Sequence, residues 1–326
     1  MKYCVKTLLL SGLLLYSSAT IAEIISMESF IDEMVTQHGF NRFNLMQVLN
    51  KAKTKRSILK IMSRPAGKVS PWYKYRRRFV TSKRIKKGVK FWHRNIRALN
   101  HAEVTYGVPA EMIVAIIGVE TNYGTNKGGY RVIDALKTLG FNYPRRADFF
   151  RDELKHYLLL TREEGLNPLK QKGSYAGAMG LGQFMPSSFR RYAVDFDRDG
   201  RRNIWTNNTD AIGSVANYFD RFGWQTGQPV IKPTQVHPNA IEKLLALKFK
   251  PQYTLRQLKK WGLLYHGDEP NNTNAMVIDL KTEQGTTYWV GFQNYYVITR
   301  YNRSKRYAMA VYHLAKEIAD RYEKTR

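Results

Sequence analysis

The feature that most constrains the fold of this chain is the stretch from residue 51 to residue 100, which holds 18 Lys and Arg residues and no Asp or Glu. Such a stretch has no acidic residues of its own to neutralise it, so its cations must face solvent or a polyanionic partner. We therefore expect a basic face over an aromatic core. The alternative, in which cations and aromatic rings together bind a polymer, stays open. The aromatic residues are Trp72, Tyr73, Tyr75, Phe79, Phe91 and Trp92.

Composition indicates a folded protein, but it does not identify the polyanion that the protein binds. The chain has 326 residues, a formal net charge of +27 and 13% aromatic residues. So many aromatic residues exclude general disorder, and the length suggests roughly two domains. The excess charge calls for a polyanion, which could be nucleic acid, an anionic membrane or an anionic cell-wall polymer.

The N-terminus predicts export. Lys2 and Lys6 flank the start of an apolar run over residues 5–16, and small residues follow as far as Ala22. This pattern is typical of a secretory signal peptide, and the run is too short to span a bilayer. Cys4 precedes the run, whereas a lipid-attachment cysteine would follow it. We predict a signal peptide over 1–22, cleaved near Ala22, and a soluble periplasmic protein without a lipid anchor. Export makes nucleic acid an unexpected partner.

Apolar spacing predicts a mainly α protein with a small β component (α+β). Residues at helical period run through most of the chain, whereas short β-type runs, such as 275–280 and 286–290, fall between residues 226 and 293. Pro, Thr and Asn become frequent between residues 226 and 293, which indicates a small mixed insertion. The predicted helices lie at 28–62 with a break at Gly39, 89–106, 109–120, 147–164, 186–193, 209–222 and 307–322.

Glu120 is the first candidate for chemistry. It follows Ile113 and Ile116 at helical spacing and so shares an apolar stripe. Desolvation there raises the pKa of a carboxyl group, and a protonated carboxylic acid is the general acid that glycosidic cleavage requires. Spacing alone also allows a glutamate that simply emerges where the helix reaches the surface.

Two loops are further candidates. Residues 173–182 are rich in Gly and Ala, so their backbone can approach a ligand closely, or they form a packed turn. The segment 195–203 places Asp195, Asp197 and Asp199 at positions one, three and five of an EF-hand-like loop, with Gly200 at position six and Arg201 at position seven. Asp210 could supply a late carboxylate. The alternative is a solvated turn whose arginines neutralise its aspartates.

Together these segments resemble the membrane-bound lytic murein transglycosylase B family of bacterial cell-wall enzymes. The resemblance covers most of the mature chain. It rests on Arg64-Pro65-Ala66, Trp72 with Tyr75-Arg76, Gly107-Val108-Pro109, the Glu120 motif 118–124, the segment 141–146, the Gly-rich loop, the segments 192–196 and 210–219, and Arg300-Tyr301-Asn302.

The resemblance implies a lysozyme-like helical core with a helical N-terminal domain and a small β-containing insertion. We place the helical N-terminal domain at 23–85 and the catalytic core with the EF-hand-like loop at 86–225. The mixed insertion then covers 226–290, and the chain returns to the core at 291–326.

The resemblance also implies the reaction, which is cleavage of the β-1,4 bond between N-acetylmuramic acid and N-acetylglucosamine without water. Glu120 serves as acid and then as base, leaving a 1,6-anhydromuramoyl end. Glycan strands of peptidoglycan are the implied partner, and structural Ca²⁺ is the implied cofactor. A non-catalytic basic protein that binds murein or another polyanion is the alternative. The implied substrate-binding residues are Ser174, Gln183, Tyr218, Tyr301, Asn302 and Tyr307, and the metal site has Asp195, Asp197, Asp199, Arg201 and Asp210.

Overall fold

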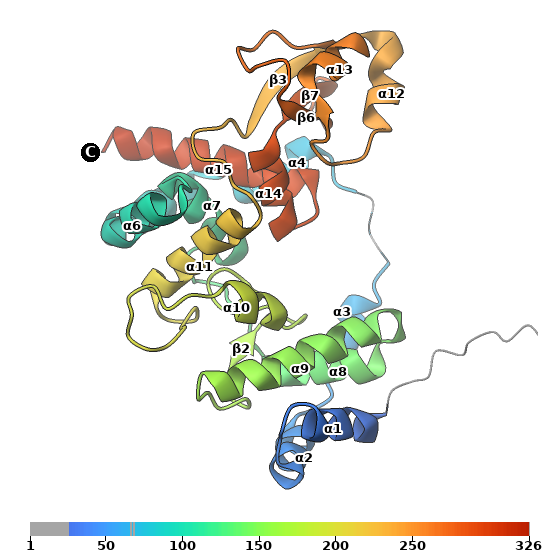
Figure 1. Ribbon diagram of the computed structural model, residues 1–326, viewed down its shortest axis with the longest axis vertical. Helices are drawn as coiled ribbons and strands as arrows, with labels where there is room; N and C mark the ends of the chain where they lie inside the picture. The colour runs from blue at the N-terminus through green and yellow to red at the C-terminus, as the bar shows by residue number, and fades with distance from the viewer. Residues whose placement is uncertain (1–25, 66, 68, 326) are drawn as a thin grey trace, which may run out of the picture. The chain divides into compact units, whose positions relative to one another are not determined.

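The computed structural model describes residues 26–65, 67 and 69–325 (Figure 1). The predicted signal peptide and its cleavage site near Ala22 lie outside the described residues. The chain divides into two compact units, with the division between Met46 and Gln47.

The first unit contains α1 (Met27–Thr36) and the first half of α2 (Arg42–Lys51). The Ser26 hydroxyl caps α1 by accepting a hydrogen bond from the Ser29 amide at 3.0 Å, which satisfies one of the free N–H groups of the first turn. Arg42 forms ion pairs with both Glu28 and Asp32, and these pairs join the two helices.

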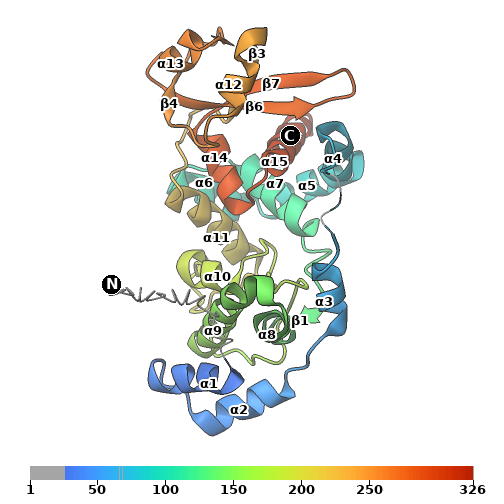
Figure 2. The same cartoon turned by 90° about the vertical axis from the view of Figure 1, so that its right-hand side faces the viewer.

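Helix α7 (Ala110–Thr121) is the centre of the second unit (Figure 2). Every residue from Met112 to Val119 is buried, because other helices of this unit pack around α7 on several sides. A helix that is apolar all round belongs in a protein core. The helices that contact it are α5 (Ser82–Arg94), α6 (Ile96–Tyr106), α11 (Asn208–Arg221) and α15 (Lys305–Glu323).

A second group of helices lies beside this core. Helix α9 (Ala147–Glu163) packs along α8 (Val132–Asn142) and against α10 (Pro186–Tyr192). Buried Glu153 accepts hydrogen bonds from the Ser187 amide and hydroxyl, which fixes the start of α10. The remaining elements here are α3 (Arg56–Met62), the 3-10 turn η1 (Pro144–Arg146), and β1 (Tyr130–Arg131) paired antiparallel with β2 (Lys172–Gly173).

The insertion is built on a five-stranded antiparallel sheet with the order β4-β6-β7-β3-β5. The central hairpin pairs Ile278 with Trp289, and the sheet has its own core around Leu255, Leu258 and Val290. Helix α14 (Gln293–Tyr301) returns the chain to α15, and α4 (Trp72–Phe79) packs against β6. The insertion elements are β3 (Ile231–Val236), η2 (Pro238–Ala240), α12 (Ile241–Leu245), β4 (Tyr253–Thr254), α13 (Leu255–Lys260), β5 (Leu263–Leu264), β6 (Asn274–Lys281) and β7 (Thr286–Gly291).

The sequence predicted most of the helices but only two of the strands. Strands β6 and β7 and the helices after Pro109, Pro186 and Thr209 lie where expected. The helical pattern predicted over 89–106 is confirmed, as two helices, α5 and α6, with a break between them at Asn95. Helices α4, α8, α12, α13 and α14 and strands β1 to β5 were not predicted individually. The domain boundaries after residues 85, 225 and 290 stay predictions.

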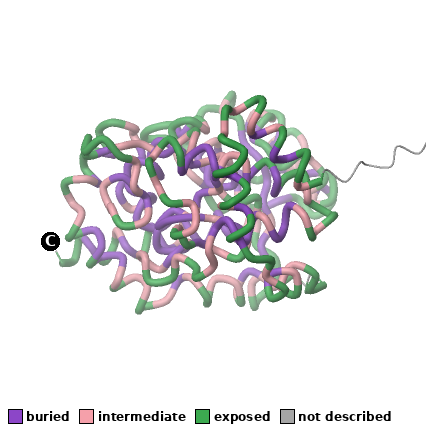
Figure 3. The backbone as a smooth tube through the Cα atoms, turned by 90° about the horizontal axis from the view of Figure 1, so that it is seen from below, coloured by how far each residue is buried: buried purple, intermediate pink, exposed green. Residues whose placement is uncertain are grey.

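Burial alternates along most of the chain. Figure 3 shows buried and exposed stretches following one another at short intervals, as expected for amphipathic helices packed on a common core. Among the described residues, no single helix is both long and apolar enough to cross a bilayer. Helices α6 and α7 meet that criterion only as a pair, and they are bent by 114° relative to each other.

Candidate active site

Glu120 lies in the last turn of α7, where the helix meets the Gly-rich loop. The helix ends at Asn122, which adopts the left-handed conformation with φ of 50°. The neighbouring Thr121 hydroxyl donates to the carbonyl of Leu181 at 3.0 Å and accepts from the Gly124 amide at 3.0 Å. The bond to Leu181 fixes this end of α7, and with it Glu120, against the Gly-rich loop.

The environment of Glu120 favours its protonated form. Burial raises the pKa of this carboxyl group to about 7, and the hydrogen bond from the Tyr307 hydroxyl to Oε1, at 2.5 Å, opposes part of that rise. The position at the negative end of the helix dipole acts in the same direction as burial. Near neutral pH, Glu120 can therefore both donate and accept a proton.

A cluster of tyrosines lies next to Glu120. Tyr307, on α15, donates to Glu120, while the Tyr301 hydroxyl donates to the Gly182 carbonyl in the Gly-rich loop. Burial raises the pKa of both phenols well above the usual value, and the charge of Glu120 adds to the rise. The Tyr218 ring lies 4.8 Å from the Tyr301 ring, centroid to centroid, and its hydroxyl donates to the Arg300 carbonyl at 2.8 Å.

Side-chain hydrogen bonds and close packing hold the Gly-rich loop. The Ser174 hydroxyl oxygen accepts from the amides of Ala176 and Ala178 at 3.2 and 3.0 Å. Gly177 has a φ of 87°, and a Cβ at this position would lie 2.5 Å from a Leu136 methyl carbon, so only glycine fits. Gln183 also has a positive φ, of 52°, and its side-chain amide donates to the Gly180 carbonyl at 3.0 Å.

The structure thus brings some of the predicted substrate residues together. Tyr307 contacts Glu120 directly, and Tyr301, whose phenol responds to the charge of Glu120, donates to Gly182 in the Gly-rich loop, next to Gln183. The described structure shows no hydrogen bond between Ser174 and Glu120. Asn302 is exposed just after α14. Their role in binding sugar stays a prediction.

Tyr75 was not selected as a site residue, although it lies in the electrostatic surroundings of Glu120. Burial raises the pKa of the Tyr75 phenol, the charge of Arg306 lowers it and the charge of Glu120 raises it. The Arg306 guanidinium lies 5.2 Å from the centroid of the Tyr75 ring. The signal in the sequence was the mixture of aromatic and basic residues in 51–100, which also fitted an ordinary basic surface.

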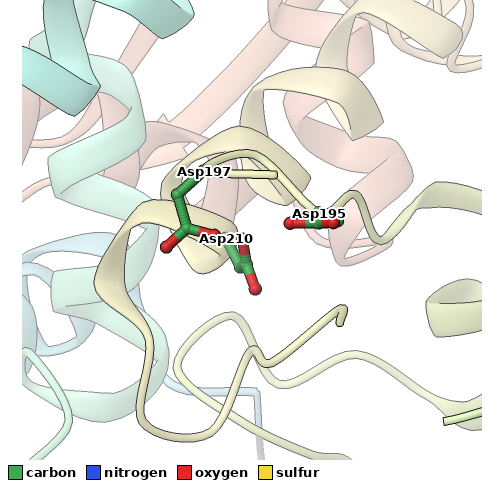
Figure 4. Close-up of side chains that lie close together, drawn as sticks. All are labelled: Asp195, Asp197 and Asp210. Atoms are coloured by element: carbon green, nitrogen blue, oxygen red, sulfur yellow. The ribbon is translucent and has the colours of Figure 1, made fainter. Parts of the chain in front are cut away.

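Three carboxylates converge at the EF-hand-like loop (Figure 4). Asp195, Asp197 and Asp210 each offer an oxygen within 4.8 Å of the others. Such a set of hard oxygen donors suits Ca²⁺. Burial raises the pKa of Asp210, and the charges of Asp197 and Asp195 add to the rise. A cation between the three groups would relieve that repulsion.

The other predicted metal residues lie differently. Asp199 is exposed, and its Oδ1 accepts a hydrogen bond from the Arg201 amide at 2.9 Å. Asp210 accepts from the amides of Phe196 and Asn203 at 2.8 and 2.7 Å, and so links the start of α11 to the loop. Arg202, one of the cations near the loop, is paired with Glu164. Asp199 and Arg201 stay predicted ligands.

Comparison with known proteins identifies the family. The sequence profile described as "Transglycosylase SLT domain" matches residues 25–316. The chain belongs to this transglycosylase family. The transglycosylase is 46% identical, over 90% of its own length and 82% of the relative's, to the membrane-bound lytic murein transglycosylase B of Escherichia coli (strain K12).

Solved structures support the same family assignment. Soluble lytic transglycosylase SltB1 from Pseudomonas aeruginosa is 51% identical with a TM-score of 0.86, covering 89% of this chain and 97% of that one. Escherichia coli Slt35 in complex with calcium is 46% identical with a TM-score of 0.80, covering 90% and 92%. SltB3 from Pseudomonas aeruginosa, in complex with NAG-NAM-pentapeptide, is 28% identical with a TM-score of 0.78, covering 90% and 80%. The expected family, the mainly α lysozyme-like fold and the lytic transglycosylase assignment are therefore confirmed.

Proposed function

We propose that this transglycosylase cleaves the β-1,4 bond between N-acetylmuramic acid and N-acetylglucosamine in peptidoglycan, with Glu120 as its only catalytic carboxyl group. The observation that carries the proposal is a buried glutamate whose pKa is raised to about 7, at the end of a core helix. Burial and the Tyr307 hydroxyl determine the pKa of Glu120, and no other carboxylate of the described residues contributes to the change in that pKa.

In the first step, protonated Glu120 transfers its proton to the glycosidic oxygen as the bond from that oxygen to C1 of the muramoyl residue breaks. The N-acetylglucosamine leaves with a free hydroxyl group. Glu120 is then ionised, and the hydrogen bond from the Tyr307 hydroxyl stabilises the carboxylate.

In the second step, the muramoyl C6 hydroxyl attacks C1, and the Glu120 carboxylate accepts the hydroxyl proton. The 1,6-anhydro ring closes, and Glu120 returns to its protonated form. No water enters the balance. A second carboxylate, which hydrolytic glycosidases use to activate water or to form a covalent intermediate, is not needed.

The remaining predicted residues take binding roles. We assign Tyr307 to the orientation of Glu120, because their contact is direct. Gln183 and Tyr301 both hydrogen-bond to the Gly-rich loop, and we assign them with Tyr218 to the wall of the glycan site. Ser174 and Asn302 are only partly buried or exposed, so they remain accessible to hydrogen-bond an N-acetyl or hydroxyl group of the sugar.

Structural Ca²⁺ is part of the proposal. Asp195, Asp197 and Asp210 fit the ion by their donor type and mutual proximity, and Slt35 was solved in complex with calcium. A bound cation would join the loop to the start of α11, which carries Asp210. It supplies charge neutralisation there and takes no part in bond cleavage.

We place the enzyme in the periplasm, where its substrate lies. The predicted signal peptide supports this placement, as does the kinship with a murein enzyme. Peptidoglycan glycan strands are the proposed partner, and the basic residues in 51–100 favour association with the anionic envelope.

The test is digestion of purified murein by wild type and by Glu120→Gln. We expect the variant to lose at least about 100-fold in rate, the lower range for removal of a general acid. Glu111→Gln is the matched control, because Glu111 lies in the first turn of the same helix and burial also raises its pKa. Equal lysis by wild type and Glu120→Gln, or no lysis by wild type, would favour a non-catalytic binding protein.

A further inference from the structure

A pocket of about 420 Å³ lies between the segment before α4, strand β6 and the start of α15. Figure 2 shows the β6–β7 hairpin beside α4. Arg77 of α4 pairs with Glu283 in the hairpin turn at 2.6 Å, and Lys305 of α15 pairs with Asp279 of β6. These ion pairs hold the walls of the pocket together.

Apolar side chains and cations line the pocket, together with one carboxylate, that of Asp279, which pairs with Lys305. Trp72 and Leu280 line the pocket and are buried. Lys281 is exposed, and Arg306 donates one hydrogen bond to the Ser70 carbonyl. Among the described residues, neither cation has a carboxylate partner, unlike Lys305. The guanidinium of Arg306 retains further N–H groups that can bind a carboxylate through two parallel hydrogen bonds.

The pocket adjoins the surroundings of Glu120. Arg306 precedes Tyr307, whose hydroxyl donates to Glu120 at 2.5 Å. The guanidinium of Arg306 also lies 5.2 Å from the centroid of the Tyr75 ring, and the Tyr75 phenol is sensitive to the charges of both Arg306 and Glu120. The start of α15 therefore carries both a cation that lines the pocket and the residue that hydrogen-bonds to Glu120.

We propose that this pocket binds a free carboxylate of the peptide carried by the muramoyl residue, with Arg306 and Lys281 as the recognising cations. The inference rests on the proposed function, which puts a muramoyl residue at Glu120. The peptide is attached through the lactyl ether at C3, two ring carbons from the reacting C1. SltB3 was solved with a fragment that carries a pentapeptide, and such a peptide ends in a carboxylate. Trp72 and Leu280 provide an apolar surface for the adjoining peptide atoms.

The test measures binding in the Glu120→Gln background, where fragments are not consumed. Calorimetry compares three fragments of equal sugar length, which carry a peptide, no peptide, or a peptide with its carboxylates amidated. We expect the first to bind more tightly than the other two, and high salt to reduce its advantage.

Single substitutions test which residues cause the tighter binding of the peptide-bearing fragment. Arg306→Gln is expected to lower the ratio of affinities for peptide-bearing and peptide-free fragments by about tenfold, as for a charged hydrogen bond. Lys281→Gln, at an exposed position, should lower it about twofold to fivefold. Lys248→Gln is the control, because it removes one exposed charge from the same insertion outside the pocket.

The inference would be overturned if peptide-bearing and peptide-free fragments bound with equal affinity in the Glu120→Gln background. It would also be overturned if Lys281→Gln and Lys248→Gln had the same ratio of these two affinities. These outcomes are separate from failure of the proposed function. If wild type cuts murein but peptide-bearing and peptide-free fragments bind equally well, only the assignment of the pocket fails. Wild type that does not cut but retains the difference keeps the pocket as a recognition site and removes the catalytic assignment.

Discussion

At the scale of single residues, the proposed role of Glu120 links the pH dependence of stability to that of activity. Burial raises the pKa of this carboxyl group from 4.5 to about 7, so the ionised form is the one that the fold disfavours. The contribution of the neutral form to stability is complete below pH 4.5 and is lost as the pH rises through about 7. The rate of cleavage, which depends on protonated Glu120, should fall over the same pH range.

Glu120→Gln should therefore become more stable than wild type as the pH rises. The two proteins should unfold alike near pH 4. At pH 8 the variant should gain up to about 3 kcal/mol, since each pKa unit corresponds to about 1.4 kcal/mol. Denaturant unfolding at both pH values measures the difference. A difference that does not change with pH would contradict the assigned environment of Glu120.

Tyr307→Phe should move the upper pH limb of activity. The Tyr307 hydroxyl stabilises ionised Glu120, so its removal raises the pKa of Glu120 further, by about one unit for a charge-assisted hydrogen bond. We expect a lower rate with the limb displaced to higher pH. Tyr312→Phe on the same helix is the control, and an unmoved limb in Tyr307→Phe would show that the contact does not tune the acid.

The sequence could predict Glu120 but not its surroundings. Its place on an apolar stripe is a local pattern, and local spacing is readable from one chain. Tyr307 lies 187 residues away, so their contact exists only in the folded core, and it was the family resemblance that pointed to Tyr307. Tyr75 was missed because a half-buried aromatic in a basic stretch has no distinctive local pattern.

At the scale of elements, a close contact fixes the EF-hand-like loop to α11. A Cβ on Gly213 would lie 2.3 Å from the Phe196 ring, so the loop can lie against the helix only because residue 213 is glycine. Gly213→Ala should destabilise the protein by about 1–3 kcal/mol through overpacking. Gly129→Ala is the control, since a Cβ there has no neighbour within 4 Å. Equal melting temperatures for both variants would contradict this packing.

Calcium should stabilise the wild type through the same loop. We expect a rise in melting temperature with added Ca²⁺, because a ligand that binds only the folded state stabilises it. Asp197→Ala should lose most of that rise, whereas Asp268→Ala, an exposed carboxylate in the insertion, should retain it. No calcium-dependent rise in wild type would remove the ion from the account.

Elements that the sequence did not predict depend on tertiary contacts. Strand β3 contains Pro233, which disfavours a strand, yet Pro233 pairs only with Trp289 of β7 while the short strand β5 begins its pairing at Gln235. The break between α5 and α6 occurs where the Asn95 side chain donates to the Phe91 carbonyl and accepts from Asn208 on α11. Neither arrangement is visible in local periodicity.

At the scale of the whole molecule, the basic stretch buries aromatic rings and exposes many of its cations. Trp72, Phe91 and Trp92 are buried, and Arg76 and Arg77 are paired with Glu317 and Glu283. Other cations of α4 and α5 and of the start of α6 point to solvent and have no carboxylate partner among the described residues. They are Lys74, Arg78, Lys83, Lys86, Lys90, Arg94 and Arg97.

This basic face should strengthen binding to murein without taking part in cleavage. Replacing Lys83, Lys86 and Lys90 of α5 with Gln should weaken sedimentation with sacculi by about threefold or more at low salt, from the small contribution of each exposed charge. The difference should vanish at high salt. The control replaces three exposed lysines of the insertion, Lys248, Lys250 and Lys260. Equal binding by the two triple variants at low salt would contradict a localised docking face.

The most direct test of the central claim is the chemical nature of the ends that wild type produces from purified murein in ¹⁸O-labelled water. Cleavage by Glu120 alone, with the muramoyl C6 hydroxyl as nucleophile, predicts 1,6-anhydro ends that contain no label and are lighter than reducing ends by one water molecule. Mass spectrometry of the released fragments distinguishes the two. Reducing ends that carry ¹⁸O would contradict the account, because they would show that water is the nucleophile.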